Sequence, residues 1–265
     1  MRDKKRIWKY VFAGAIVFFA FVLIPLLFRS PSLTREWDED VRILSEAAIS
    51  DSGDVTLSAV RNWTYTVGSI ESKEYFEMVY SPSDIEGLWM YEQVLDPKGL
   101  IAHTFLVFEF NEHYGEARYL GLSVETRREE EEEYSVIGGA LRSFEITHIW
   151  ATEKDLVTRR VQYLDYPLTR YRLQIPEEYL GRLFIKFATE TADLSQNPRW
   201  YNTLTNNCTS SLVRYVNEAE PGAIPFHFSL VFTGKIDDYL KDLSYLDAIY
   251  AEYITREHLS SNELR

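Results

Sequence analysis

An uncharged N-terminal run restricts the architecture of this chain more than any other feature. No residue from Tyr10 to Phe28 is charged, and these 19 residues are close to the roughly 20 that a helix needs to cross the hydrocarbon core of a bilayer. The segment before the run is basic, and the positive-inside rule keeps such a segment in the cytoplasm. We therefore predict one uncleaved membrane-spanning helix, with the residues after it outside the cytoplasmic membrane. The basic residues are Arg2, Lys4, Lys5, Arg6 and Lys9.

A cleavable signal peptide is the competing interpretation of the same run. Such a peptide ends at a small-x-small cleavage site, and Phe28-Arg29-Ser30-Pro31 is a poor match to one. No cysteine follows the run at a lipoprotein processing position. The anchor is therefore the favoured interpretation. Residues 31–58 are expected to form a helical connector, because apolar residues recur at helical spacing between Glu36 and Ile49.

The charge balance beyond the anchor excludes one class of partner. After residue 30 the chain holds 22 basic and 40 acidic residues, a net charge of −18. Nucleic-acid binding needs clustered Lys and Arg, so an acidic surface of this kind argues against it. About 235 residues remain for one sizeable domain. Aromatic residues at 15% and hydrophobic residues at 46% supply an ample core.

The apolar pattern predicts a sheet with helices packed on it. Ile101 to Phe110 is almost wholly apolar, as expected of a strand covered on both faces, and Tyr119 to Thr126 follows it after a turn. Helical spacing of apolar residues after Pro176 and after Cys208 predicts two amphipathic helices. The expected fold class is α+β, an antiparallel sheet with packed helices. Further strands are expected at 62–67, 89–95, 144–152 and 156–164, and helices at 176–192, 208–219 and 236–246.

Cys208 is the only cysteine in the chain, so no internal disulfide can form and its use is either packing or reactivity. It stands at the start of the second predicted helix. Unpaired backbone N–H groups and the positive end of the helix dipole favour a thiolate there. Polar neighbours on both sides favour a reactive thiol. The alternative is a small buried apolar residue beneath a helix start.

His103 is the histidine best placed to act as a base for this thiol. The chain has five histidines, and this one interrupts its most apolar strand. A histidine in a dry sheet needs partners for both ring nitrogens, so a satisfied core histidine is one interpretation. The other is that the strand directs the imidazole at Cys208, because a nucleophilic thiol needs a base and the base needs an orienting group.

Glu125 is the first candidate for that orienting group. Every second residue from Gly121 to Glu125 shares one face of the following strand, so Glu125 could hold the imidazole if His103 faces that side. Two arginines follow directly, and a local ion pair with them is the alternative for Glu125. Glu92 is a second candidate for the orienting role. The candidates for positioning a substrate are Glu92, Arg127 and Arg128.

The backbone N–H of Cys208 is the natural donor to an oxyanion at this thiol. The supporting side chains that we consider are Asn206, Asn207 and Tyr201. The chain has no second cysteine, no His-x-x-x-His pair and no Gly-rich phosphate loop, so we expect neither a metal nor another cofactor. Gly-x-Ser-x-Gly does not occur either, which argues against a serine hydrolase.

Several short segments resemble the periplasmic domain of the Lnb-type lipoprotein N-acyltransferase family. The similarity runs from about residue 60 to 247, and Asn206-Asn207-Cys208-Thr209 is quite specific. That family resembles a permuted branch of the papain-like, NlpC-type thiol enzymes, in which the histidine precedes the cysteine as in lecithin–retinol acyltransferases. This chain has the same order. The segments are Asn62-Trp63, Ser81-Pro82, Tyr91-Glu92-Gln93-Val94, Ala102-His103-Thr104-Phe105, Glu125-Thr126-Arg127-Arg128-Glu129 and the residues from Tyr201 to Thr209.

The resemblance implies roles for the residues and a reaction. Cys208 would be the nucleophile, His103 the base and Glu125 the third group. The thiolate would take an acyl chain from a phospholipid as a thioester and pass it to the α-amine of the N-terminal cysteine of a diacylglyceryl lipoprotein. The chain would then be a cofactor-independent acyltransferase of the bacterial inner membrane, whose partners are phospholipid, diacylated lipoprotein and the bilayer. Its predicted parts are a tail and anchor at 1–30, the connector at 31–58, a periplasmic papain-like domain at 59–250 and a C-terminal tail at 251–265.

Three alternatives remain open at this point. A cell-wall endopeptidase or amidase, or a lipid acyl-hydrolase, could use the same Cys-His pair. An anchored binding module with an inert, buried Cys208 would need no such pair. A deep apolar cavity at Cys208 would favour the acyltransferase, whereas an open polar groove would favour the endopeptidase.

Overall fold

The computed structural model describes residues 8–14, 17–18, 21, 24 and 28–260. Nine of the 19 residues of the predicted membrane-spanning helix at residues 10–28 lie outside the described residues. Within the described part of the chain, no helix combines the length and the apolar character that a membrane crossing requires. The domain considered below is built from residues 28–260.

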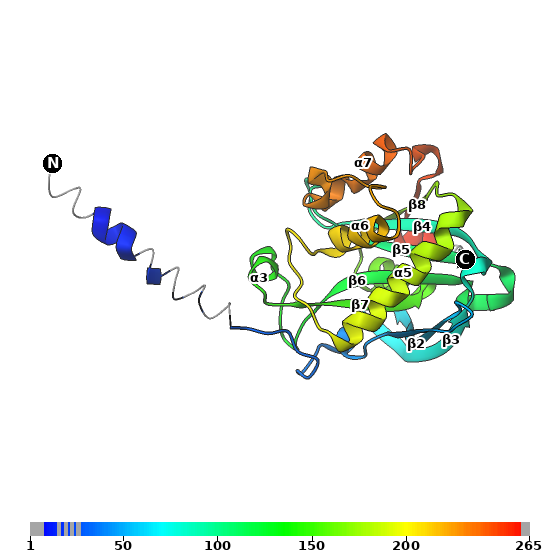
Figure 1. The fold of residues 1–265 in the computed structure, drawn as a ribbon, viewed down its shortest axis with the longest axis horizontal. Helices are drawn as coiled ribbons and strands as arrows, with labels where there is room; N and C mark the ends of the chain where they lie inside the picture. Colours follow the sequence, from blue (N-terminus) through cyan, green and yellow to red (C-terminus); the bar gives the residue numbers. More distant parts are fainter. Residues whose placement is uncertain (1–7, 15–16, 19–20, 22–23, 25–27, 261–265) are drawn as a thin grey trace.

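A nine-stranded sheet forms the centre of the domain (Figure 1). Its strands are β1 (Glu46–Ile49), β2 (Val55–Thr66), β3 (Ser69–Tyr80), β4 (Ile85–Val94), β5 (Ala102–Phe110), β6 (Tyr119–Arg127), β7 (Glu145–Thr152), β8 (Leu168–Arg172) and β9 (Glu252–Ile254). The order is β1-β2-β7-β6-β5-β4-β8-β9, and β3 pairs with β2 outside this path. Among these strands the pairs are antiparallel, except for one parallel pair between β2 and β7. The predicted mixed fold with a largely antiparallel sheet is confirmed.

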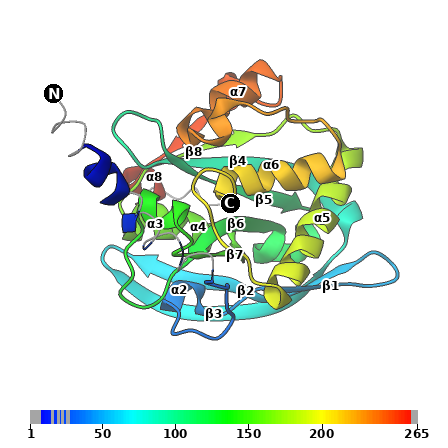
Figure 2. The same cartoon turned by 60° about the vertical axis from the view of Figure 1, so that its left-hand side comes forward.

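Helices cover both faces of the sheet, and they are α2 (Glu39–Arg42), α3 (Val136–Ala140), α4 (Glu153–Thr158), the π-helical turn η3 (Arg159–Tyr163), α5 (Glu177–Gln196), α6 (Cys208–Ala219), α7 (Ile236–Asp242) and α8 (Arg256–Ser260). α5, α6 and α7 lie on one face, over a core that includes Leu106 and Phe108 (Figure 2). α4 and η3 lie on the other, over Phe105 and Val107. Alternate residues of β5 thus enter two separate cores, which explains why this strand is apolar almost throughout.

α4 approaches the sheet closely because β6 carries a glycine beneath it. A Cβ atom at Gly121 would lie 2.3 Å from Cδ1 of Leu156, which is too close for any side chain. On the opposite face, α5 is held by the predicted apolar stripe, whose Phe184 and Phe187 are fully buried. The ring of Phe184 meets that of Phe108 edge to face at 5.2 Å between centroids. Helices therefore pack on both faces of the sheet and fix the positions of its strands.

Two predicted elements differ in the structure. The helix expected between Glu36 and Ile49 is only the four residues of α2, and the chain then continues as β1, because backbone pairing with β2 outweighs the helical spacing of its side chains. The strand expected at 156–164 is helical, since Val157 and Val161, four residues apart, both pack on the sheet. The sheet also extends past both ends of the predicted domain at 59–250, through β1 and β9.

Candidate active site

Cys208 is the first residue of α6, as the sequence predicts, and it is almost fully buried. Asn207 caps the helix: its side chain accepts a hydrogen bond from the N–H of Ser210, whose hydroxyl accepts one from the N–H of Asn207. Helix geometry leaves the N–H groups of Cys208 and Thr209 without an intrahelical acceptor. The thiol sulfur lies 3.9 Å from the carbonyl oxygen of Ala102, at the beginning of β5. The helix start therefore presents the thiol and two backbone donors at the end of the sheet.

His103 is the second residue of β5 and lies at the point where β5 and β6 separate. The ladder between these strands ends at the pair Phe105 and Ser123, so His103 and Glu125 stand just beyond it. Both side chains lie on the face that carries α4, as the alternation along β6 predicts. The imidazole Nε2 is 2.8 Å from the hydroxyl of Ser123 and 3.3 Å from Oε1 of Glu125. Since Nε2 makes these contacts, Nδ1 is the nitrogen available to the sulfur of Cys208.

The charges around this pair favour an ionised thiol. Burial opposes ionisation of Cys208, but the hydrogen bond and the positive charge of His103 lower the pKa of the thiol below its ordinary value. Burial also opposes a charged imidazole, yet the carboxylate of Glu125 and the hydrogen bond to Cys208 raise the pKa of His103 to about 9. Against the cost of its own burial, the positive charge of His103 holds the pKa of Glu125 well below its usual range. These charges therefore favour a thiolate paired with an imidazolium at the site.

Two residues of this cluster, Arg160 and Ser123, were not assigned a role from the sequence. Arg160, from the π-helical turn, places Nη2 2.7 Å from Oε1 of Glu125 and 3.1 Å from the hydroxyl of Ser123. The same hydroxyl donates to Glu125 at 2.7 Å. The guanidinium is almost fully buried and lies over the ring of Phe105, 4.5 Å from its centroid. Two adjacent arginines, Arg159 and Arg160, interrupt the largely apolar stretch 156–164 and were the available signal for Arg160. They were overlooked because that stretch was interpreted as a strand.

The two asparagines before the cysteine have structural partners. The amide of Asn207 donates to the carbonyl oxygens of Thr203 at 2.9 Å and Leu230 at 3.0 Å, so it is not free to donate to an oxyanion. The amide of Asn206 donates to Trp200 O at 2.8 Å, and its oxygen accepts from Ser211. Both side chains hold the loop and helix start around Cys208 instead. The backbone N–H groups of α6 are then the main candidates for the oxyanion donors.

Tyr201 is buried beside the thiol site. Burial, reinforced by the negative charge of Cys208 and by Tyr134, raises the pKa of its phenol, so the hydroxyl stays protonated. The backbone N–H of Tyr201 donates to Phe144 O at 2.9 Å, which ties this loop to the residue before β7. A protonated hydroxyl whose pKa responds to the charge of Cys208 suits the supporting role that the sequence predicts.

The predicted substrate-positioning residues lie elsewhere. Arg127 donates to the carbonyl oxygens of Val41 at 3.0 Å and Arg42 at 2.8 Å, and Arg128 pairs with Asp38 at 3.1 Å. Both arginines therefore hold the segment around α2 against the sheet, and neither pairs with Glu125.

Glu92 faces away from the imidazole. It is paired across the strands with Thr104, on the face opposite to His103, so it cannot orient that ring. Burial and the nearby charge of Asp237 raise the pKa of Glu92 to about 8. In the part of the chain that the structure describes, no group of three or more His, Cys, Asp or Glu side chains is arranged to hold a metal ion.

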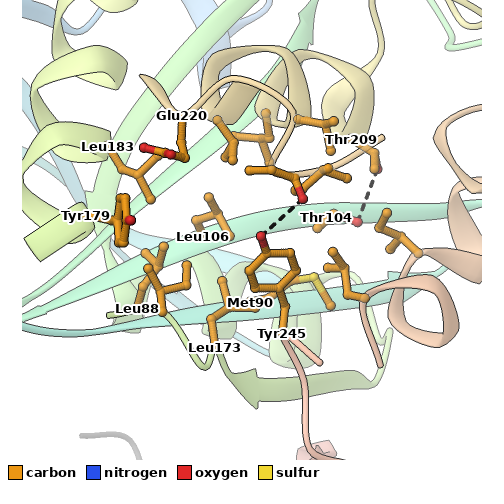
Figure 3. Close-up of a pocket in the computed structure, with 18 of the residues that line it drawn as sticks. Leu88, Met90, Thr104, Leu106, Leu173, Tyr179, Leu183, Thr209, Glu220 and Tyr245 are labelled. Carbon is orange, nitrogen blue, oxygen red and sulfur yellow. Dashed lines mark hydrogen bonds between the residues drawn. The ribbon is translucent and has the colours of Figure 1, made fainter. Parts of the chain in front are cut away.

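An apolar cavity of about 440 Å³ includes Thr209, the residue after Cys208, in its lining (Figure 3). Thr104 and Thr209 form one end of it, joined by a hydrogen bond of 3.3 Å, and the hydroxyl of Thr209 lies 3.8 Å from the sulfur of Cys208. From there the cavity continues between the sheet and the helices α5, α6 and α7. Its walls are mainly aliphatic and include Met90, Leu106, Leu183, Leu212, Val216 and Leu240.

A buried cysteine at a helix start, with a histidine and a carboxylate on neighbouring strands, defines a thiol site with an apolar compartment. The model of the Lnb N-terminal periplasmic domain family matches residues 71–234, more than half of the chain, and the chain belongs to this family. The resemblance stated from the sequence is thus confirmed, and a periplasmic domain agrees with the predicted location outside the cytoplasm. No curated protein and no solved structure matches the chain.

Proposed function

We propose that this protein is an acyltransferase in which Cys208 carries an acyl chain as a thioester. The donor is a phospholipid, and the acceptor is the α-amine of the N-terminal cysteine of a diacylglyceryl lipoprotein. Membership of the Lnb family and the lowering of the Cys208 pKa by His103 support the proposal. The order of the three groups along the chain, histidine, carboxylate and then cysteine, also suits a permuted papain-like enzyme.

The first half of the reaction uses the protonated imidazole. The Cys208 thiolate attacks the ester carbonyl, and the oxyanion that forms accepts hydrogen bonds from the N–H groups at the start of α6. As the carbon–oxygen bond breaks, His103 gives its proton to the departing alkoxide. The products are a lysophospholipid and a thioester at Cys208, with a neutral imidazole.

The second half reverses the proton transfer. The neutral amine of the lipoprotein attacks the thioester carbonyl, and His103 accepts the proton that the nitrogen loses. The carbon–sulfur bond then breaks and the thiolate leaves, paired again with an imidazolium. Because Glu125 stabilises the imidazolium in both halves, its carboxylate acts as a positioning group for His103.

The observation that carries the proposal is the cavity beside the thiol. Its wall along α6 begins at Thr209 and reaches Glu220, the residue after the helix, and these eleven residue steps span about 16 Å at the rise of an α-helix. One leaflet of a bilayer has acyl chains about 15 Å long, half of the hydrocarbon core. An acyl chain whose carbonyl lies at Cys208 therefore fits along the cavity, and removal of its methylene groups from water favours binding.

The predicted anchor completes the proposed arrangement. A single membrane-spanning helix at residues 10–28, with its basic end in the cytoplasm, would hold the domain at the periplasmic surface of the inner membrane. Both lipid substrates lie in that membrane. A cell-wall endopeptidase would instead use a polar groove at the thiol, and the aliphatic lining of the cavity favours the acyltransferase over it.

The test is the intact mass of the full-length protein after incubation with phospholipid vesicles. We expect an acyl adduct on the wild type that hydroxylamine removes and that Cys208→Ala lacks. No adduct on the wild type, together with cleavage of peptidoglycan fragments, would refute the proposal. Addition of a diacylated lipopeptide separates transferase from hydrolase: we expect the adduct to disappear with formation of an amide on the peptide, not of free fatty acid.

His103→Ala tests the proton transfers. Loss of a general acid–base group costs about 10²–10⁴-fold in rate, so thioester formation is expected to fall by at least that lower factor. The folded state is checked by circular dichroism. Full activity of this variant would exclude His103 as the base.

A further inference from the structure

Large apolar side chains are exposed on the loops that surround Cys208. Phe226 and Phe228 are 75% and 70% exposed, and Ile137 of α3 is 72% exposed. Folding leaves such residues in water at a cost, and a contiguous exposed apolar area marks an interaction surface. We call the six residues Leu100, Ile137, Leu204, Phe226, Phe228 and Phe232 the apolar rim.

Hydrogen bonds connect the segments that carry the rim residues to one another and to the start of α6. The N–H of Gly234 donates to Leu100 O at 3.1 Å, which joins the loop between β4 and β5 to the phenylalanine loop. The amide of Asn207 donates to Thr203 O and Leu230 O, so it ties the loop of Leu204 to the same phenylalanine loop. The hydroxyl of Thr203 in turn donates to Val136 O at 3.0 Å, in α3. Four segments are therefore linked in series, and Asn207, the residue before Cys208, is one of the links.

The end of the uncharged N-terminal run joins the domain close to the apolar rim. The guanidinium of Arg29 donates to Arg142 O at 3.4 Å, and the N–H of Ser32 donates to Glu145 Oε1 at 3.2 Å. Both acceptors follow α3 in the chain, and Figure 1 shows the N-terminal segment leaving the domain on the side of α3. The run at 10–28 ends at Phe28, one residue before Arg29. A helix in the membrane at that run would hold the α3 side of the domain against the bilayer surface.

We propose that the apolar rim docks the domain on the periplasmic leaflet of the membrane, with Phe226 and Phe228 inserted at the lipid interface. This inference rests on the proposed function, since it specifies how the site meets its lipid donor. A bilayer is the occupant that the neighbouring uncharged run favours, and aromatic and aliphatic side chains suit the interfacial layer. The rim segments meet at Asn207, next to the thiol, so docking would bring phospholipid esters to Cys208 without exposure of their chains to water.

The opposite end of the sheet supplies a matched control. Val79 of β3 is also an exposed apolar residue, at 55%. Its neighbour Tyr80 packs on Phe110, the last residue of β5, whereas His103 stands at the beginning of that strand. Val79 therefore lies at the end of the sheet away from the rim. A photoreactive probe at Val79 measures the lipid labelling of an exposed apolar position that does not belong to the rim.

The experiment uses the full chain with Cys208→Ala, reconstituted in vesicles of phosphatidylethanolamine and phosphatidylglycerol. A photoreactive p-benzoylphenylalanine replaces Phe226, Phe228, Ile137 or Val79, one at a time, and lipid adducts are measured by intact mass after irradiation. We expect several-fold more lipid adduct at the three rim positions than at Val79. Equal labelling at all four positions, or no lipid adduct at the rim, would overturn the proposal.

A second measurement separates insertion from proximity. In Phe226→Ser/Phe228→Ser, the probe at Ile137 is expected to lose most of its lipid adduct, because the domain no longer sits on the surface. Val79→Ser is expected to leave the lipid adduct of the probe at Ile137 unchanged. An undiminished signal in the double variant would show that the anchor alone brings α3 to the lipid, contrary to docking. Because Cys208 is absent from these proteins, the outcome does not depend on whether the thioester forms.

Discussion

Two acidic and two basic groups lie together at the thiol site. Cys208 and Glu125 are the acidic groups, and His103 and Arg160 are the basic ones. Burial lowers the pKa of Arg160 to about 10, and the charge of Glu125 opposes that effect, so the guanidinium remains charged at neutral pH. Because the cluster is largely buried, the loss of any one charge is expected to change the protonation of the others.

Glu125→Gln is the substitution that tests this dependence. The carboxylate raises the pKa of His103 to about 9, so the imidazolium persists up to that pH, and activity of the wild type should decline only as the pH rises past about 9. Glutamine has nearly the same shape without the charge. The alkaline decline of thioester formation should therefore move to lower pH, which a rate measurement between pH 6 and pH 10 would show.

Ser123→Ala is the control for that experiment. It removes a hydrogen bond to Nε2 of His103 but leaves the charge of Glu125 in place. Its rate should fall while the alkaline decline stays near that of the wild type. If Glu125→Gln and the wild type share the same pH profile, Glu125 does not govern the protonation of His103.

At the scale of single elements, the start of α6 depends on one capping residue. Asn207→Ala removes the acceptor for the N–H of Ser210 and both donors to the loops of Thr203 and Leu230. The cap alone contributes about 1 kcal/mol, so the free energy of unfolding should fall by at least that amount in urea denaturation. Asn207→Asp keeps the acceptor and should lose less. Equal stability of the alanine variant and the wild type would contradict the capping role.

The sequence predicted the elements whose signals are local. β5 and β6 were found from their apolar runs, and the start of α6 from the polar residues before Cys208. The partnership of His103 with Glu125 followed from the alternation of side chains along β6. Short apolar stretches such as 156–164 fit both a strand and a helix, because their length is too small to separate the two periods. Because this stretch was interpreted as a strand, the contact of Arg160 with Glu125 was missed.

At the scale of the whole molecule, the cavity could not be predicted from any segment. It lies between the sheet and α5, α6 and α7, and its lining comes from β4, β5, the segment after β8 and the three helices together. The apolar rim is likewise assembled from four separate segments. Both features belong to the tertiary arrangement, yet the proposed function depends on them as much as on the thiol.

The length of the cavity should set the length of the acyl chain that is transferred. Val216 lines the cavity on α6, seven residues after Thr209, or about 10 Å along the helix. Val216→Phe would obstruct the cavity at that point, so a chain that spans about 15 Å in a leaflet no longer fits. With a donor mixture of short and long chains, the mass of the adduct on Cys208 should shift from long chains toward short ones.

Arg214→Phe adds the same side chain to α6 outside the cavity lining and is the matched control. Extra volume in a packed region costs about 1–3 kcal/mol, so thermal unfolding must show that Val216→Phe is folded under the assay conditions. We expect the control to keep the chain-length distribution of the wild type. If Val216→Phe also keeps that distribution, the acyl chain does not lie along α6, and the cavity serves another purpose.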